Sequence, residues 1–309
     1  MSHHNYAIIG GTTKAATTSL FFYLRSHPEV NAVNMKETRY FLDPNYPLVA
    51  KDTYSGDPEG FNQFFDTIDS RLMLEATPDY LYGHKTPKWL HEAFGDRVKI
   101  IFILRNPLNR LESWYKFGQQ DGRIPAEESF QTYVMKMFDS HHQSTQPYLA
   151  LEQGRYYENI KRWFEFFPQD QIEIIFFEEL QEKPKELVKT LSSCLNIDPS
   201  FYDDFEFKVS NKSFVSRSPK LYKRYLKLVN KLSFALHDSP AIRGLLKPVR
   251  QFIDKQFISQ KETKKAISTL DTNLLNRLSD YYRQDIEELS IITKIPYSWQ
   301  ENFALKNEY

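Results

Sequence analysis

Short apolar runs alternate with segments of helical spacing over the first half of the chain. The strand-like runs are residues 6–9, 30–33, 71–75, 98–104 and 171–177. Residues 17–25 and 156–167 have helical spacing, and Asn106-Pro107 opens a further helix with a proline near its first turn. The run 98–104 (VKIIFIL) is almost wholly apolar, which is typical of a central strand buried on both faces. The alternation predicts an α/β fold: a mainly parallel sheet flanked by helices, with ligands at the carboxyl ends of the strands.

Beyond about residue 185 the pattern becomes mostly helical. No internal repeat or low-complexity linker interrupts the chain. We therefore expect residues 1–309 to form a single domain, with a core over about 5–185 and a helical C-terminal part over about 186–309.

Composition limits the partners, metal sites and cellular location that we expect for this protein. Lys+Arg and Asp+Glu are equal at 40 each, which gives no argument for a nucleic-acid partner. The single cysteine, Cys194, excludes an internal disulfide and a cysteine-based zinc cluster. No apolar run approaches the roughly 20 residues of a transmembrane helix, and the first strand leaves no room for a signal peptide. We expect a cytoplasmic, metal-independent protein.

The segment 216–265 is strongly basic and partly amphipathic. The interpretation that we favour is a solvated helical face packed on the domain. The alternatives are attraction of an anionic acceptor and peripheral contact with a membrane surface.

The first apolar run leads into the loop GGTTKAATTSL, residues 10–20. Consecutive backbone N–H groups in a glycine-containing turn, followed by a helix start, form an anion site. Thr17, Thr18 and Ser19 add hydroxyl groups, and Lys14 adds a positive charge. A nucleoside-triphosphate loop of the GxxxxGK[ST] kind places its lysine directly before the Ser/Thr. Here Lys14 comes three residues before Thr17.

A second polar segment follows the central strand. Arg105 comes where the run 98–104 ends, and arginine suits bidentate phosphate recognition. Ser113 lies two turns into the next helix and can donate to the same group. A lone arginine here would more often cap the strand and pair with an acid. Together the two segments suggest a ligand with two separate anionic ends.

The two segments resemble the signatures of sulfotransferases that use 3′-phosphoadenosine 5′-phosphosulfate (PAPS). GGTTKAATTSL is similar to GxxKxGTTxL, and RNPLNRLESWY (105–115) is similar to RNPxxRxxSxY. The segments HPEVNAVNMKETRYF (27–41), EATPDYLY (75–82) and GRYYENIKRWFEFFP (154–168) also resemble the family. The carbohydrate branch, with its heparan-sulfate-type enzymes and bacterial relatives, is the most similar.

The resemblance implies a role for each matching position. Lys14 would contact the oxygen that bridges phosphate and sulfate, and Arg105 and Ser113 would hold the 3′-phosphate. Glu37 aligns with the glutamate that acts as general base. No metal is needed. The residues implied to bind the 5′-phosphosulfate are Thr12, Thr13, Lys14, Ala15, Ala16, Thr17, Thr18 and Ser19.

The chain also departs from the family pattern. Ala16 replaces a common glycine, which is unfavourable if the position needs a positive φ. Arg39 stands where heparan-type members often have histidine, and is a candidate contact to an acidic acceptor. Glu75 either lies near the acceptor or makes a structural hydrogen bond at the Thr-Pro turn. The family's basic loop over the nucleotide is not recognisable in 209–222, where Lys212 and Arg217 are the candidates.

The expected function is transfer of a sulfuryl group from PAPS to a hydroxyl or amine of a carbohydrate or glycoconjugate by in-line displacement. One alternative is the same chemistry on a lipid or small-molecule alcohol. Alternatives of another class are a P-loop kinase or NTPase, and a non-catalytic nucleotide-binding protein. The sequence does not identify the acceptor or the oligomeric state.

Overall fold

A computed structural model describes residues 5–48, 50, 52–67, 71–139, 148–208, 215–216, 258–259 and 266–303. The chain divides into two compact units. One comprises 1–110, 152–211 and 278–309, and the other comprises 111–151 and 212–277. Lys212, Arg217 and nearly all of the basic segment 216–265 lie outside the described residues, so their predicted roles stay predictions.

The first unit is built on a sheet of five parallel strands in the order β2-β3-β1-β4-β5. The strands are β1 (Asn5–Gly11), β2 (Val30–Ala32), β3 (Leu72–Ala76), β4 (Val98–Leu104) and β5 (Ile172–Phe176). Every residue of β3 is buried, and β4 is buried except at Lys99. Strands buried on both faces require apolar residues at successive positions, which is why the runs were readable in the sequence. The predicted α/β fold with a mainly parallel sheet is confirmed.

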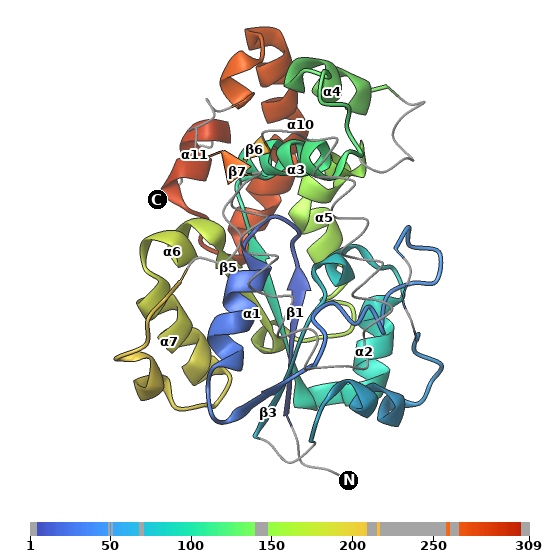
Figure 1. The fold of residues 1–309 in the computed structure, drawn as a ribbon, viewed down its shortest axis with the longest axis vertical. Helices are drawn as coiled ribbons and strands as arrows, with labels where there is room; N and C mark the ends of the chain where they lie inside the picture. The colour runs from blue at the N-terminus through green and yellow to red at the C-terminus, as the bar shows by residue number, and fades with distance from the viewer. Residues whose placement is uncertain are drawn as a thin grey trace. The chain divides into compact units, whose positions relative to one another are not determined.

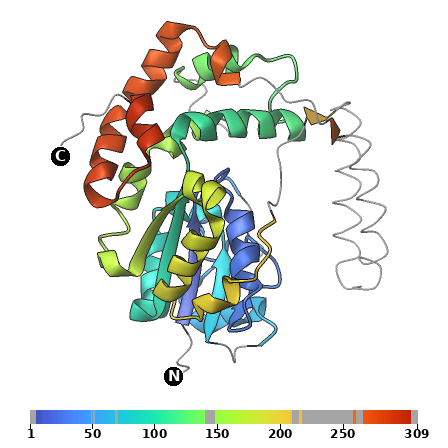
Figure 2. The ribbon, with the colours of Figure 1, turned by 90° about the vertical axis from the view of Figure 1, so that its left-hand side faces the viewer.

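Helices cover both faces of this sheet (Figures 1 and 2). Helix α1 (Thr17–Arg25) lies beside α7 (Pro184–Cys194) on one face, and α2 (Thr86–Phe94) packs on the other. The remaining helices with residues in this unit are α3 (Pro107–Asp121), α5 (Tyr156–Ile160), α6 (Phe177–Glu182), α10 (Thr272–Ile292) and α11 (Tyr297–Phe303). Helices α1, α3 and α6 start within a few residues of the carboxyl ends of β1, β4 and β5, so the connecting loops meet at one edge of the sheet.

The predicted helix over 156–167 is shorter in the structure. Helix α5 ends at Ile160, and 161–167 continue as turns. Trp163 N donates to Ile160 O at 2.8 Å, a three-residue turn that replaces the helical spacing. The indole of Trp163 is fully buried and meets Phe102 of β4 edge-on, with ring centroids 5.0 Å apart. Helix α2 was not predicted.

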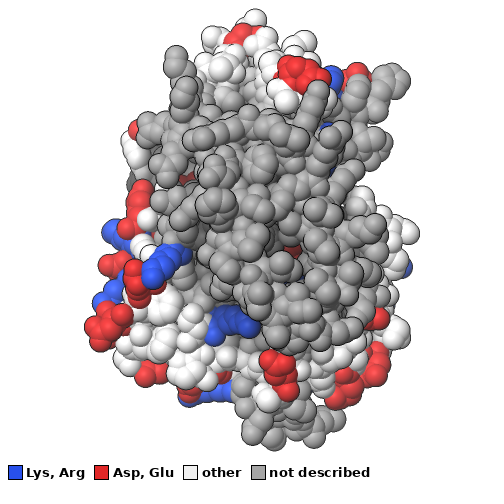
Figure 3. Space-filling view, viewed as in Figure 1, with Lys and Arg blue, Asp and Glu red and all other residues white. Residues whose placement is uncertain are grey.

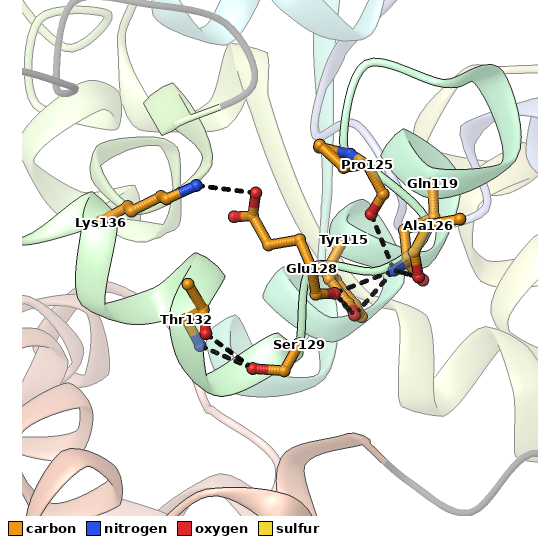
Figure 4. Close-up of polar contacts among 8 residues, drawn as sticks. All are labelled: Tyr115, Gln119, Pro125, Ala126, Glu128, Ser129, Thr132 and Lys136. Atoms are coloured by element: carbon orange, nitrogen blue, oxygen red, sulfur yellow. Dashed lines mark hydrogen bonds and ion pairs between the residues drawn. The ribbon is translucent and has the colours of Figure 1, made fainter.

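The second unit contains most of α3, helix α4 (Phe130–Met137) and a short antiparallel pair, β6 (Val215–Ser216) with β7 (Ile258–Ser259). Polar contacts hold the loop between α3 and α4 (Figure 4). Tyr115 Oη donates to Glu128 O at 2.6 Å, Lys136 Nζ pairs with Glu128 Oε2 at 2.8 Å, and Ser129 caps α4 by accepting from Thr132 N. Tyr115 of the second signature therefore supports this loop.

Acidic and basic side chains intermingle on the described parts of the face in Figure 3, in line with the equal totals of the two charges. Within the described ranges, no helix has the length and apolar character needed to cross a bilayer.

Candidate functional site

The loop after β1 has the backbone geometry of an anion site. Thr12 N donates to Ile103 O at 2.8 Å, which holds the loop against β4. Lys14 and Ala16 are left-handed, with φ of 70° and 63°, and Ala16 is the N-cap residue of α1. Left-handed residues among right-handed ones turn successive N–H groups toward a common concavity, and the first N–H groups of a helix have no partner within it. The position of Ala16 thus does adopt the positive φ that glycine favours.

The predicted loop residues differ in access. Thr12 and Ala15 are fully buried, and Thr17 and Ser19 nearly so. Thr13, Lys14, Ala16 and Thr18 are half-buried and reach the surface. Two loop amides are already engaged, since Thr12 N donates to Ile103 O and Ala15 N donates to Thr12 O at 3.4 Å. The groups that can face an anion are therefore the helix-start amides, the Thr18 hydroxyl and the Lys14 ammonium group.

The two predicted anion-binding segments meet in the fold. Arg105, which follows β4, donates through Nη1 to Lys14 O at 3.0 Å. Its guanidinium stacks 4.3 Å from the Phe177 ring centroid, and Tyr156 Oη donates to Arg105 O at 2.6 Å. Arg105 is half-buried. A cation held over an aromatic ring beside the loop suits a second anionic group of the same ligand.

Ser113, the other residue predicted at the 3′-phosphate, lies on α3 within the second unit and is buried. Its shared phosphate contact with Arg105 stays a prediction.

Arg110 is a residue whose role the sequence did not reveal. Its side chain is fully buried, and Nε donates to Thr13 O at 3.1 Å. Nη2 donates to Thr13 Oγ1 at 3.2 Å, to Tyr82 Oη at 3.3 Å and to Gln153 Oε1 at 2.9 Å. The available signal was its match to the second arginine of RNPxxRxxSxY. Arg110 fixes the carbonyl side of the anion loop and so leaves the amide side for a ligand.

Glu37 lies in the loop after β2, in a left-handed conformation with φ of 66°. Its N–H donates to Ala76 O at 3.0 Å. Oε1 pairs with Lys36 Nζ at 2.8 Å, Oε2 lies 3.6 Å from Arg39 Nη2, and 37% of the side chain is exposed. Lys36 was missed, although it forms part of the quoted MKETRYF segment. An exposed carboxylate fixed by two cations can accept a proton from a bound nucleophile.

Glu75, at the end of β3, is fully buried beneath the Glu37 loop. Its Oε1 accepts from Thr38 N at 3.2 Å, Thr38 Oγ1 at 3.1 Å and Thr77 Oγ1 at 2.5 Å. Burial raises its pKa to about 7, against the opposing effect of these hydrogen bonds. Glu75 thus makes the structural hydrogen bond at the Thr-Pro turn, one of the two roles that the sequence left open. Its predicted acceptor contact is untested.

These groups converge because four neighbouring strands end together. The loops that follow β2, β3, β1 and β4 carry Glu37, Thr77, Lys14 and Arg105, respectively. That edge is where open α/β sheets bind ligands. The described residues include no group of three or more His, Cys, Asp or Glu side chains that could hold a metal ion.

The chain has relatives among known proteins. It is 26% identical to a bifunctional heparan sulfate N-deacetylase/N-sulfotransferase of Drosophila melanogaster, over 62% of this chain and 20% of that protein. It is 25% identical to the human heparan sulfate glucosamine 3-O-sulfotransferase 6, over 67% of this chain and 57% of that protein. The chain therefore spans less than two thirds of the length of these relatives.

A solved structure shares the fold. The crystal structure of a sulfotransferase from Alicyclobacillus acidocaldarius superposes with a TM-score of 0.66 at 20% identity, covering 97% of this chain and 100% of that one. Residues 6–290 match the family model of the sulfotransferase domain, which confirms the predicted family. This chain belongs to the sulfotransferase-domain family.

Proposed function

We propose that this protein transfers a sulfuryl group from PAPS to a hydroxyl or amine of a carbohydrate or glycoconjugate. The assignment of PAPS as the donor rests on the hydrogen bond that joins Arg105 to the Lys14 loop. This contact places two cationic side chains where one ligand can bind both. The acceptor part is supported by the heparan sulfate enzymes among the relatives. Family membership favours this reaction over the P-loop kinase alternative.

The donor-side residues suit a ligand with a 5′-phosphosulfate and a 3′-phosphate. PAPS, when bound, supplies the sulfuryl group and the leaving phosphate oxygen. The amides of residues 16–18 at the helix start provide fixed dipoles at the loop, and the Lys14 ammonium stabilises negative charge that develops there. Arg105 neutralises the second anionic end.

Glu37 is the group that removes the acceptor's proton in this proposal. Lys36 and Arg39 hold its carboxylate in one place, and such positioning contributes to rate as much as basicity does. Arg39 is half-buried and can also contact an acidic group of the acceptor.

Calorimetry with 3′-phosphoadenosine 5′-phosphate (PAP), ADP and ATP tests the donor. We expect PAP to bind at least about tenfold tighter than ADP, because only PAP carries the 3′-phosphate that Arg105 recognises. Arg105→Ala should remove that gain and leave ADP binding unchanged. Arg71→Ala is the matched control, since Arg71 is exposed and precedes β3 at the opposite edge of the sheet. Equal affinities for PAP and ADP, or nucleotide turnover that a magnesium chelator abolishes, would overturn the donor assignment.

Transfer from labelled PAPS to desulfated heparan oligosaccharides tests base and acceptor together. Glu37→Gln should bind PAP normally and lose transfer by at least about 100-fold, the usual contribution of a general base. Glu92→Gln, an exposed position on α2, is the control. Retained transfer would exclude Glu37 as the base. Labelling of lipid alcohols but of no saccharide would reject the carbohydrate part and keep the donor part.

A further inference from the structure

A row of hydrogen-bonded polar side chains, three of them buried and Tyr46 half-buried, runs away from the anion loop. Arg110 Nη2 donates to Gln153 Oε1 at 2.9 Å, Gln153 Nε2 donates to Tyr46 Oη at 3.0 Å, and Tyr46 Oη donates to Asp79 Oδ1 at 2.8 Å. We call these four residues the polar chain. Arg110, Gln153 and Asp79 are each at most 7% exposed. All four belong to the first unit.

The chemistry of its ends gives the polar chain one direction. A guanidinium has only donors and a carboxylate has only acceptors. The Gln153 amide must therefore turn its oxygen to Arg110 and its nitrogen to Tyr46, and the Tyr46 hydroxyl must give its proton to Asp79. Burial and the neighbouring Asp79 charge raise the pKa of Tyr46 well above its ordinary value, so the hydroxyl keeps that proton. With every orientation fixed, a shift at one end leaves a buried group unsatisfied unless the other members follow.

The two ends contact different parts of the site. At one end Arg110 holds the carbonyl and hydroxyl of Thr13 in the anion loop. Next to the Asp79 end, Tyr46 belongs to the segment 36–48, which carries Glu37. Internal turns connect them, since Leu42 N donates to Arg39 O at 3.0 Å and Tyr46 N donates to Asp43 O at 2.9 Å.

We propose that Gln153 and Tyr46 are positioning residues that link the anion loop to the segment 36–48, so that nucleotide bound at the loop orders the segment that carries Glu37. The inference rests on the proposed function only for the identity of the nucleotide. Nucleotide bound at the loop restricts the position of Thr13, and Thr13 restricts Arg110 through their hydrogen bonds. Arg110 in turn restricts Tyr46 through Gln153. The base is then held most firmly when the donor is present.

Hydrogen exchange with and without saturating PAP tests this link. In the unchanged protein, PAP should slow amide exchange within 36–48 as well as in the loop 12–19. Tyr46→Phe removes only the hydroxyl, and it should cut the PAP-dependent slowing in 36–48 at least about twofold while PAP affinity changes less than about threefold. Tyr54→Phe is the matched control, because Tyr54 also contacts the segment, through its N–H to Tyr40 O at 2.8 Å, and its hydroxyl is not part of the polar chain. It should keep the full effect.

A second variant tests whether the effect of Tyr46→Phe comes from the broken polar chain or from a local structural change at Tyr46. Gln153→Glu keeps an acceptor for Arg110 and replaces the donor that faces Tyr46, so it should also reduce the PAP-dependent slowing in 36–48 and keep it in 12–19. If PAP leaves 36–48 unchanged, or both variants retain the wild-type effect, the link is overturned. Failure of PAP to bind at all would instead reject the proposed donor.

Discussion

Ala16 has a backbone conformation that favours glycine, although its side chain carries a methyl group. It sits at the N-cap of α1 with φ of 63° and ψ of 25°. A left-handed L-residue is roughly 1–2 kcal/mol less favourable than a right-handed one, and only glycine adopts this region freely. The strain is stored in the loop proposed to bind the donor.

Ala16→Gly should therefore increase the free energy of unfolding, by about 1 kcal/mol after the greater chain entropy of glycine is allowed for. Urea unfolding measures the change. Ala15→Gly is the matched control, because Ala15 is fully buried and is not among the residues with positive φ. That variant should lose stability. A less stable Ala16→Gly protein would show that the methyl group makes contacts worth more than the strain.

The sequence predicted candidate site residues where one short segment carries several of them. Lys14, Glu37 and Arg105 each stand in a quoted signature, so their convergence followed from the strand order. Tyr46, Gln153 and the role of Arg110 were not predictable, because their contacts join positions up to 107 residues apart. No periodicity connects such positions before the chain is folded.

At the scale of elements, helix α5 depends on a distant cap. The residue before it, Arg155, makes no side-chain hydrogen bond to the helix start. Instead Asp285 of α10 accepts from Tyr157 N at 3.0 Å and Glu158 N at 2.9 Å. A carboxylate at a helix N-terminus satisfies orphan donors and interacts favourably with the helix dipole.

Asp285→Ala should lower the free energy of unfolding by about 1–3 kcal/mol, because two partly buried N–H groups lose their acceptor. Asp285→Asn should lose less, since one oxygen remains. Asp280→Ala, on the same helix, removes an exposed pair with Arg283 and should change stability by less than about 0.5 kcal/mol. Chemical denaturation compares the three. Equal losses at positions 280 and 285 would reject the cap.

The most continuously buried strand was the element that the sequence predicted best. Strand β4 is almost continuously apolar, and its predicted bounds agree with the structure. Helix α5 was predicted too long, because buried aromatic residues beyond Ile160 continue the helical spacing as packed turns. Apolar periodicity reports which side chains are buried, and it does not distinguish a helix from turns that bury the same side chains.

At the scale of the whole molecule, two buried carboxyls make stability depend on pH. Burial raises the pKa of Glu75 from 4.5 to about 7 and that of Asp285 from 3.8 to about 6. Between its unfolded and folded pKa values, each group binds more protons in the folded state than in the unfolded one. The contribution of these two groups to stability therefore falls as pH rises through these windows and levels off above about 7.

Glu75→Gln isolates the larger of the two effects. The amide keeps an oxygen for Thr38 and Thr77 and cannot ionise, so the variant should lose the part of the pH dependence that lies between pH 5 and 7.5. Each pKa unit corresponds to about 1.4 kcal/mol, so the difference between the two proteins should grow by at most about 3 kcal/mol over that range, in favour of the variant at the alkaline end. Urea midpoints at half-unit pH intervals measure this difference, and Asp285 contributes equally to both curves. Glu92→Gln changes an exposed residue and is the control, so its urea midpoint should vary with pH as that of the unchanged protein does.

If the urea midpoint of Glu75→Gln also varied with pH as that of the unchanged protein does, the Glu75 carboxyl would ionise at the same pH in the folded and unfolded chains. Its hydrogen bonds to the Glu37 loop would then fully offset its burial.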